Sequence, residues 1–208
     1  GDWAGCAVAE VERMNPDLIG LTTIGCAGDQ NPSDKGGIEA AERQGKQLAV
    51  EVDRILATKL KLVEGKLRIR FRQIELPFDE IPDEATWEAK AEQKGIEGFH
   101  ALRQLKQLRQ QGSLPQTLKY PVQTWCFGSD LAMVFLGDEV VVDYALLIKS
   151  KRDPERLWVS AYSNDVACYV PSERILREGG YEGGGAMVWY NQPTRFAPGL
   201  EKLILKEV

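Results

Sequence analysis

The stretch that decides the fold is Ala161-Tyr-Ser-Asn-Asp-Val-Ala-Cys-Tyr-Val-Pro171, followed after a short interval by Gly179-Gly-Tyr-Glu-Gly-Gly-Gly-Ala-Met-Val-Trp-Tyr190. The apolar run from Leu157 to Tyr162 ends here at a polar Ser-Asn-Asp corner, and two tyrosines, Tyr169 and Tyr181, follow. Loops at the ends of strands are where proteins usually build sites. An Asn and two Tyr placed there can bind a substrate or a metal. The alternative is a glycine-punctuated connection with packed aromatic side chains.

Hydrophobic periodicity on either side of this stretch predicts alternating strands and helices. The expected strands are 18–26, 67–76, 122–127, 131–136, 157–162 and 186–190, with a hairpin turn at Gly128-Ser129-Asp130. The expected helices are 4–14, a helix capped by Asp34 that runs to about Lys59, 83–111, 139–150, 172–178 and 198–207. This alternation is typical of an α/β fold, with a mixed β-sheet and helices packed on its faces. We expect a single domain over 1–208, with the charged segment 83–111 as a helical insertion.

Composition narrows the class of protein. A net charge of −5 argues against a nucleic-acid partner bound through a general basic surface. The basic strip Lys66-Leu-Arg-Ile-Arg-Phe-Arg72 alternates charged with apolar residues, which is the pattern of a half-buried strand with a solvated face. Anion binding by this strip is the alternative. No apolar run reaches the roughly 18 residues that a membrane-spanning helix needs.

The cysteines indicate whether the chain holds a thiolate zinc site or disulfides, and the first residues indicate whether it is part of a longer protein. Cys6, Cys26, Cys126 and Cys168 form no C-x-x-C pair, which argues against a thiolate zinc site. Their apolar surroundings favour buried thiols, and a disulfide is the alternative in an exported protein. The chain opens with Gly1-Asp2-Trp3 and has no initiator Met there, so we expect a piece of a longer protein.

Polar corners follow three of the apolar runs. Asp29-Gln-Asn31 comes after Cys26, Asp138-Glu139 after Leu136, and Ser163-Asn-Asp165 after Tyr162. If these runs are neighbouring strands, the corners converge at one edge of the sheet, where ligands bind in open α/β folds.

The same corners resemble a known family. Ser163-Asn164 with Tyr169 and Tyr181-Glu182-Gly183 resembles the Asn-x-Tyr-x-x-Tyr-Val and Tyr-Glu-Gly-Ala segments of neutral (alkaline, non-lysosomal) ceramidases. Gly28-Asp29-Gln30-Asn31-Pro32 is similar to the family's Gly-Asp-Val-Ser-Pro-Asn loop, and Leu136-Gly137-Asp138-Glu139-Val140 to its Leu-Pro-Gly-Glu-Phe turn. The three matches occur in the family's order. They cover the middle and later part of its catalytic domain, and are nearest to divergent bacterial members.

The resemblance implies a zinc-dependent amide hydrolase acting on an N-acyl sphingosine-like or other N-acyl substrate, in an extracellular or periplasmic location. It places two metal ligands on Glu139 and Tyr169, and catalytic roles on Asn31, Asp29 and Tyr181. Substrate binding would fall to Asn164 and Gly28. Without the resemblance, Glu139 is a carboxylate at a helix N-terminus and Tyr169 a core or rim residue.

Two departures from the family pattern leave a second function open. The family's two histidine ligands lie upstream of the matched part, and the one histidine here, His100, matches no ligand position and reads as a surface or packed residue. The family's catalytic serine falls on Asn31, whose amide can donate to an oxyanion but cannot act as a serine. A ceramidase-derived domain that binds a ligand without catalysis is therefore the alternative to the enzyme. The oligomeric state is not indicated.

Overall fold

The computed structural model describes residues 2–33 and 35–208, so the predicted cap Asp34 and the start of the chain at Gly1 lie outside the described residues. The chain forms two compact units. The first, here called the helical unit, comprises Gly1–Ile24 and Asn31–Glu64. The second, here called the sheet unit, comprises Gly25–Gln30 and Gly65–Val208.

The helical unit consists of two packed helices, α1 (Trp3–Met14) and α2 (Gly37–Leu56). Both were predicted, apart from their exact ends. They approach closely at Gly45, where a Cβ atom would lie 2.5 Å from the Cβ of Cys6. Small side chains line the contact because they allow the two backbones to come together; those buried are Ala7, Ala40 and Ala49.

The predicted buried strand over residues 18–26 is wrong. The structure shows no strand there, and Ile19 and Leu21 in the helical unit are 87% and 90% exposed. An apolar run becomes a strand only if a neighbouring strand satisfies its backbone groups. The expected strand is also divided between the two units, because its last two residues, Gly25 and Cys26, lie in the sheet unit.

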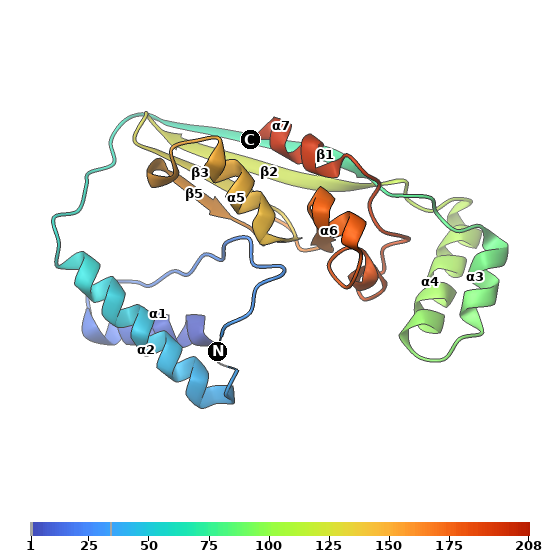
Figure 1. Cartoon of the computed structure of the whole chain (residues 1–208), viewed down its shortest axis with the longest axis horizontal. Helices are drawn as coiled ribbons and strands as arrows, with labels where there is room; N and C mark the ends of the chain where they lie inside the picture. The colour runs from blue at the N-terminus through green and yellow to red at the C-terminus, as the bar shows by residue number, and fades with distance from the viewer. Residues whose placement is uncertain (1, 34) are drawn as a thin grey trace. The chain divides into compact units, whose positions relative to one another are not determined.

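The sheet unit is built on a four-stranded sheet with the order β1-β2-β3-β5 (Figure 1). The strands are β1 (Leu67–Pro77), β2 (Thr117–Phe127), β3 (Leu131–Leu136) and β5 (Leu157–Ser160). β1 pairs antiparallel with β2, and β2 pairs antiparallel with β3 through the predicted hairpin. β3 and β5 are parallel. The predicted α/β fold with a mixed sheet is therefore confirmed.

Two helices cover one face of this sheet, α5 (Val142–Ser150) and α7 (Leu200–Glu207) (Figure 1). Their side chains share a core with the sheet; its largest fully buried members are Tyr120, Tyr144, Phe196, Leu76, Leu136, Leu200 and Ile204. α7 is also tied to β1 by an ion pair at 2.6 Å between Arg70 and Glu207. The basic strip is thus part of a strand, but the predicted half-buried face is wrong, because Leu67, Ile69 and Phe71 are 42%, 58% and 50% exposed.

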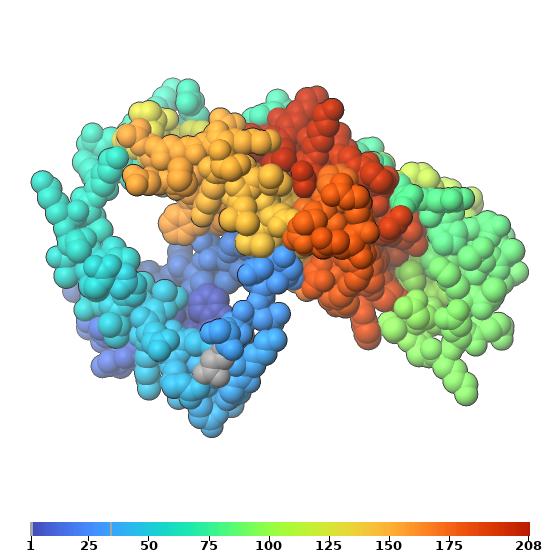
Figure 2. Space-filling view, viewed as in Figure 1, coloured from blue at the N-terminus to red at the C-terminus, as the bar shows by residue number. Residues whose placement is uncertain are grey.

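A helical hairpin fills the predicted insertion. Residues 83–111 form α3 (Glu84–Ala91) and α4 (Ile96–Gln111), and a second small core lies between them around Trp87 and Leu105. Asp83 caps α3 by accepting a hydrogen bond from the Thr86 amide at 2.8 Å. In the space-filling view the hairpin, in green, abuts the orange-red segment that follows α6 (Glu173–Glu178) (Figure 2).

Candidate functional site

The two predicted metal ligands lie side by side. Glu139 is in β4 (Glu139–Val140), and Tyr169 is in β6 (Tyr169–Val170). These short strands pair in parallel, with Glu139 directly opposite Tyr169. The helix predicted over 139–150 is thus wrong in its first residues, because they pair with β6 before α5 begins at Val142. The register brings a carboxylate and a phenol together from positions thirty residues apart.

Tyrosine hydroxyls surround the Glu139 carboxylate. The Tyr190 hydroxyl donates to Oε1 in a short hydrogen bond, and the Tyr162 hydroxyl lies 3.4 Å from Oε2. Tyr169 also hydrogen-bonds to this carboxylate. Its ring packs edge-on against Tyr181 and Tyr190, with centroid distances of 5.4 and 6.0 Å. We call Glu139 with Tyr162, Tyr169, Tyr181 and Tyr190 the tyrosine cluster.

Burial and the Glu139 carboxylate raise the pKa values of Tyr162 and Tyr169. Burial, then the charge of Glu139 and the hydrogen bond to it, raise the pKa of Tyr162 from 10.0 to about 12. Burial is also the main reason that the pKa of Tyr169 is raised well above its ordinary value, and the bond to Glu139 comes next. A protonated phenol donates to a carboxylate, so the cluster is a set of donors arranged around one negative charge.

The glycine-rich segment places Tyr181 and Tyr190. It folds as tight turns that lead into a 3-10 helix, η2 (Gly185–Val188), so the strand predicted over 186–190 is wrong. The backbone bonds locally: the Ala186 amide donates to the Tyr181 carbonyl at 2.8 Å. Gly183 is required by close packing, since a Cβ there would lie 2.3 Å from the Gly179 carbonyl oxygen. The segment is therefore a glycine-punctuated connection with packed aromatic side chains beside the Glu139 carboxylate, and substrate or metal binding there stays a prediction.

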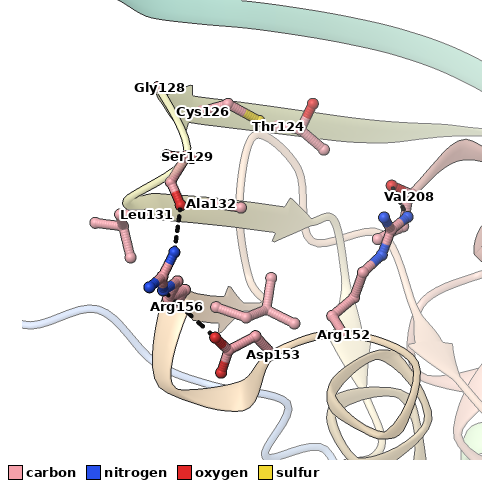
Figure 3. A pocket seen from close by; sticks show the side chains of 11 residues that line it. Thr124, Cys126, Gly128, Ser129, Leu131, Ala132, Arg152, Asp153, Arg156 and Val208 are labelled. Atoms are coloured by element: carbon pink, nitrogen blue, oxygen red, sulfur yellow. Dashed lines mark hydrogen bonds and ion pairs between the residues drawn. The ribbon is translucent and has the colours of Figure 1, made fainter. Parts of the chain in front are cut away.

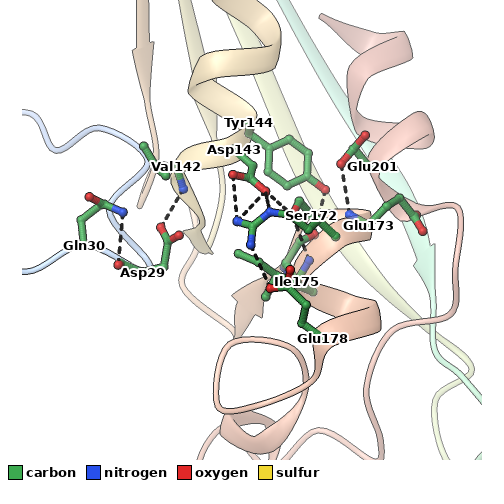
Figure 4. Close-up of polar contacts among 12 residues, drawn as sticks. Asp29, Gln30, Val142, Asp143, Tyr144, Ser172, Glu173, Ile175, Glu178 and Glu201 are labelled. Carbon is green, nitrogen blue, oxygen red and sulfur yellow. Dashed lines mark hydrogen bonds and ion pairs between the residues drawn. The ribbon is translucent and has the colours of Figure 1, made fainter.

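The first polar corner supports β4 from the other side. The Gly28 amide donates to the Val140 carbonyl at 2.9 Å, and a Cβ at Gly28 would lie 2.6 Å from the Glu139 carbonyl oxygen. Asp29 Oδ1 accepts a hydrogen bond from the Val142 amide, the first of α5, at 2.8 Å (Figure 4). A carboxylate at a helix N-terminus is favoured by the helix dipole. Gly28 and Asp29 thus lie beside Glu139, in contact with its backbone neighbours.

The third corner holds its own turn. Asn164 is exposed, has a positive φ of 71°, and donates to Gln123 Oε1 at 3.2 Å. Asp138 is 1% exposed and accepts hydrogen bonds from the Ala167 amide at 2.6 Å and from Cys168 Sγ. Burial raises the pKa of Asp138 to about 6. The three corners therefore meet around β4 and β6, although no strand leads into the first of them.

Asn31 is an exposed residue of the helical unit, in irregular chain. The tyrosine cluster lies in the sheet unit, and the predicted catalytic role of Asn31 stays a prediction.

The described residues bring together fewer zinc ligands than a protein zinc site uses. Among residues 2–33 and 35–208, no group of three or more His, Cys, Asp or Glu side chains could hold a metal ion. Glu139 and Tyr169 offer adjacent oxygen donors, whereas protein zinc sites use three or four ligands. His100 is packed: its Nε2 lies 2.9 Å from the Gln192 carbonyl oxygen, its ring meets Trp87 edge-on, and burial lowers its pKa. The pair fits part of a zinc shell, and the described chain does not complete it.

Tyr162 and Tyr190 are the members of the cluster that sequence reasoning missed. Tyr162 was read as the last residue of a strand and Tyr190 as the last of another. The available signal was position alone, since each ends an apolar run next to polar or glycine-rich residues. Their shared acceptor, Glu139, could not be read from either position.

Two cavities lie away from Glu139. One of about 390 Å³ is lined by the β2–β3 turn and by Arg152, Asp153 and Arg156, with Arg156 donating to the Ser129 carbonyl at 3.3 Å (Figure 3). Another, of about 360 Å³, lies between the glycine-rich segment and the α3–α4 hairpin and includes His100.

The described cysteines are all free thiols. Cys26 and Cys168 are buried, and burial raises the pKa of Cys26 to about 12. Of the helices that the structure describes, none is both long and apolar enough to cross a membrane.

Comparison with known proteins supports the fold. No protein-family model matches the chain, and no curated protein matches it. A solved structure described as a ceramidase complexed with C2 matches 99% of this chain with a TM-score of 0.61 and 14% sequence identity. The chain has a ceramidase-like fold. It spans 40% of the length of that ceramidase chain, and at this identity the likeness is one of fold alone.

Proposed function

We propose that this chain is part of a zinc-dependent amide hydrolase of the neutral ceramidase type, with an N-acyl sphingosine-like or other N-acyl substrate. The observation that carries the proposal is the Glu139–Tyr169 pair, held in register by β4 and β6 inside a ceramidase-like fold. Glu139 and Tyr169 would be two of the metal ligands. Bound zinc would polarise the amide carbonyl and lower the pKa of its water toward about 7.

The roles of the other residues follow from their contacts. Tyr181 is 48% exposed and packs on Tyr169, so its phenol can reach a substrate carbonyl or the developing oxyanion. Gly28 and Asp29 hold the β4–α5 segment and thereby the backbone of Glu139. Asn164 shapes the turn that precedes β6. Asn31 falls on the position of the family's catalytic serine, and we assign it the role of hydrogen-bond donor to the developing oxyanion.

Metal binding is tested on the purified chain by titrating zinc against wild type, Glu139→Gln and Glu75→Gln. Two ligands predict weak uptake by wild type, and this uptake should vanish in Glu139→Gln. Glu75→Gln is the matched control, because Glu75 is an exposed carboxylate on β1. Tight stoichiometric binding that survives Glu139→Gln would show that the ligands are elsewhere.

Catalysis is tested by incubating the zinc-loaded full-length protein with short and long N-acyl substrates and measuring release of the amine. Loss of an oxyanion donor costs on the order of 100-fold to 1,000-fold in rate, so Asn31→Ala should slow turnover by that factor and leave zinc content unchanged. Asn31→Ser should retain activity or raise it.

The second candidate function is a ceramidase-derived domain that binds a ligand without hydrolysing it. The asparagine at the serine position favours it. Zinc uptake through Glu139 with no hydrolysis of any N-acyl substrate would support this binding domain over the enzyme.

A further inference from the structure

Tyr190 has no role in the function proposed above, yet its hydroxyl hydrogen-bonds to the Glu139 carboxylate. Its hydroxyl donates to Oε1, and its ring stands edge-on to Tyr169. We propose that Tyr190 is a positioning residue for Glu139, and that the α3–α4 hairpin holds Tyr190 in place. This inference rests on the proposed role of Glu139 as a metal ligand.

The two carboxylate oxygens of Glu139 have different surroundings. Oε1 is taken by Tyr190, whereas Tyr162 lies at a longer 3.4 Å from Oε2. A glutamate side chain has several rotatable bonds, and ordering it costs conformational entropy. The bond from Tyr190 to Oε1 orders the carboxylate in advance. Carboxylates that bind metals are commonly held in this way by a further hydrogen bond.

Tyr190 is anchored by the two residues that follow it. Gln104 of α4 donates from Nε2 to the Asn191 carbonyl oxygen at 3.0 Å and to its Oδ1 at 3.2 Å. His100 of α4 lies 2.9 Å from the Gln192 carbonyl oxygen, and Gln192 donates to the Ala167 carbonyl at 2.9 Å. The buried face of α4 is thus joined through this turn to Tyr190.

The α3–α4 hairpin thus contacts the turn that follows Tyr190. Gln104 is 1% exposed; its Nε2 makes hydrogen bonds, whereas its Oε1 has no hydrogen-bond partner among the described residues. Its donors are used on Asn191, which has a positive φ of 57° in the left-handed region that asparagine adopts in turns. The hairpin therefore stabilises the one backbone conformation that directs Tyr190 toward Glu139.

The decisive variant is Tyr190→Phe, which keeps the ring and removes the hydroxyl. Its matched control is Tyr144→Phe, because the Tyr144 hydroxyl is also buried and donates to the Pro171 carbonyl at 3.1 Å. Gln104→Met tests the hairpin. Each protein is compared with wild type in zinc affinity and in the ¹³C resonance of the Tyr162 ring carbon that bears the hydroxyl, recorded at neutral pH. Tyr162 is informative because Glu139 is the acceptor that it shares with Tyr190.

We expect Tyr190→Phe to weaken zinc binding by roughly 10-fold to 100-fold, as loss of an outer hydrogen bond to a ligand typically does. It should also shift the Tyr162 resonance, and Gln104→Met should reproduce both effects more weakly. Tyr144→Phe should change neither. If Tyr190→Phe matches Tyr144→Phe in both measurements, the positioning role is wrong.

The outcomes separate this inference from the proposed function. A shifted Tyr162 resonance in Tyr190→Phe, with zinc affinity unaffected by Glu139→Gln, would uphold the positioning of Glu139 and overturn its role as a metal ligand. Zinc binding that is lost in Glu139→Gln but unchanged in Tyr190→Phe would do the reverse. If wild type takes up no measurable zinc, the resonance alone decides.

Discussion

Asp138→Asn should change how the stability of the sheet unit depends on pH. The Asp138 carboxylate is 1% exposed and accepts the Ala167 amide at 2.6 Å, and its positive φ of 63° is one that asparagine tolerates. Asparagine keeps the shape and an acceptor oxygen but cannot ionise. The substitution therefore removes one buried titration and leaves the turn in place.

The magnitude follows from linkage. Burial raises the pKa of Asp138 from 3.8 to about 6, a difference of about 2 pKa units, which corresponds to about 3 kcal/mol at about 1.4 kcal/mol per unit. The folded state has the higher pKa, so it binds the proton more tightly than the unfolded state. The stability from this group is fully present below pH 3.8 and is lost as the pH rises through about 6.

Urea unfolding followed by tryptophan fluorescence measures the effect. The free energy of unfolding of Asp138→Asn minus that of wild type should increase by about 3 kcal/mol between about pH 3 and pH 8. The exposed residue Asp17 supplies the control, Asp17→Asn, which removes the same charge without the burial. An unchanged or decreasing difference for Asp138→Asn would refute the argument that burial governs this carboxyl group.

Three further predictions test the site and its supports. Glu139→Gln should lower the pKa of Tyr162 from about 12 toward 10.0, because a neutral amide removes the nearby charge; a tyrosinate absorbance titration measures this, and an unchanged pKa would show that burial alone is responsible. Gly183→Ala should destabilise the sheet unit by about 3 kcal/mol or more in thermal unfolding, because the new Cβ would lie 2.3 Å from the Gly179 carbonyl oxygen. The control is Gly5→Ala in α1, where the new Cβ has open space and should stabilise the helix by about 0.5–1 kcal/mol. Ser172→Ala should cost about 1 kcal/mol in urea unfolding, because the serine hydroxyl accepts the Ile175 amide at the start of α6; a change below about 0.3 kcal/mol would mean that water replaces the cap.

The local elements were predictable where one physical signal dominated. Alternation of charged and apolar residues predicted β1, and the Gly128-Ser129-Asp130 turn between apolar runs predicted the β2–β3 hairpin. Helices were predictable for the same reason, since the apolar stripe lies within the segment; the predicted cap Asp34 lies outside the described residues, and α2 begins after Gly36. The strands expected at 18–26 and 186–190 failed because a strand needs a partner that the segment does not contain.

Several residues of the candidate site could be predicted from the sequence, but their contacts could not. Glu139, Tyr169 and Tyr181 were singled out from short matches to a family, and Gly28 and Asp29 came with them. The structure placed Tyr169 against the Glu139 carboxylate and packed Tyr181 on Tyr169. It also bonded Gly28 to the Val140 carbonyl and Asp29 to the first amide of α5, whereas Asn164 bonds to Gln123 of β2.

The sequence by itself determined the α/β class, most of the elements, and the residue types that gather at the polar corners. Only the tertiary structure decided that Tyr162 and Tyr190 donate to Glu139, and that His100 and Gln104 support Tyr190 from α4. The reason is that periodicity and capping report interactions within a few residues, whereas Tyr190 and Glu139 are 51 positions apart. Which distant polar groups meet depends on how the strands pair and how the helices pack, because the hydrophobic effect that drives this packing has no direction of its own.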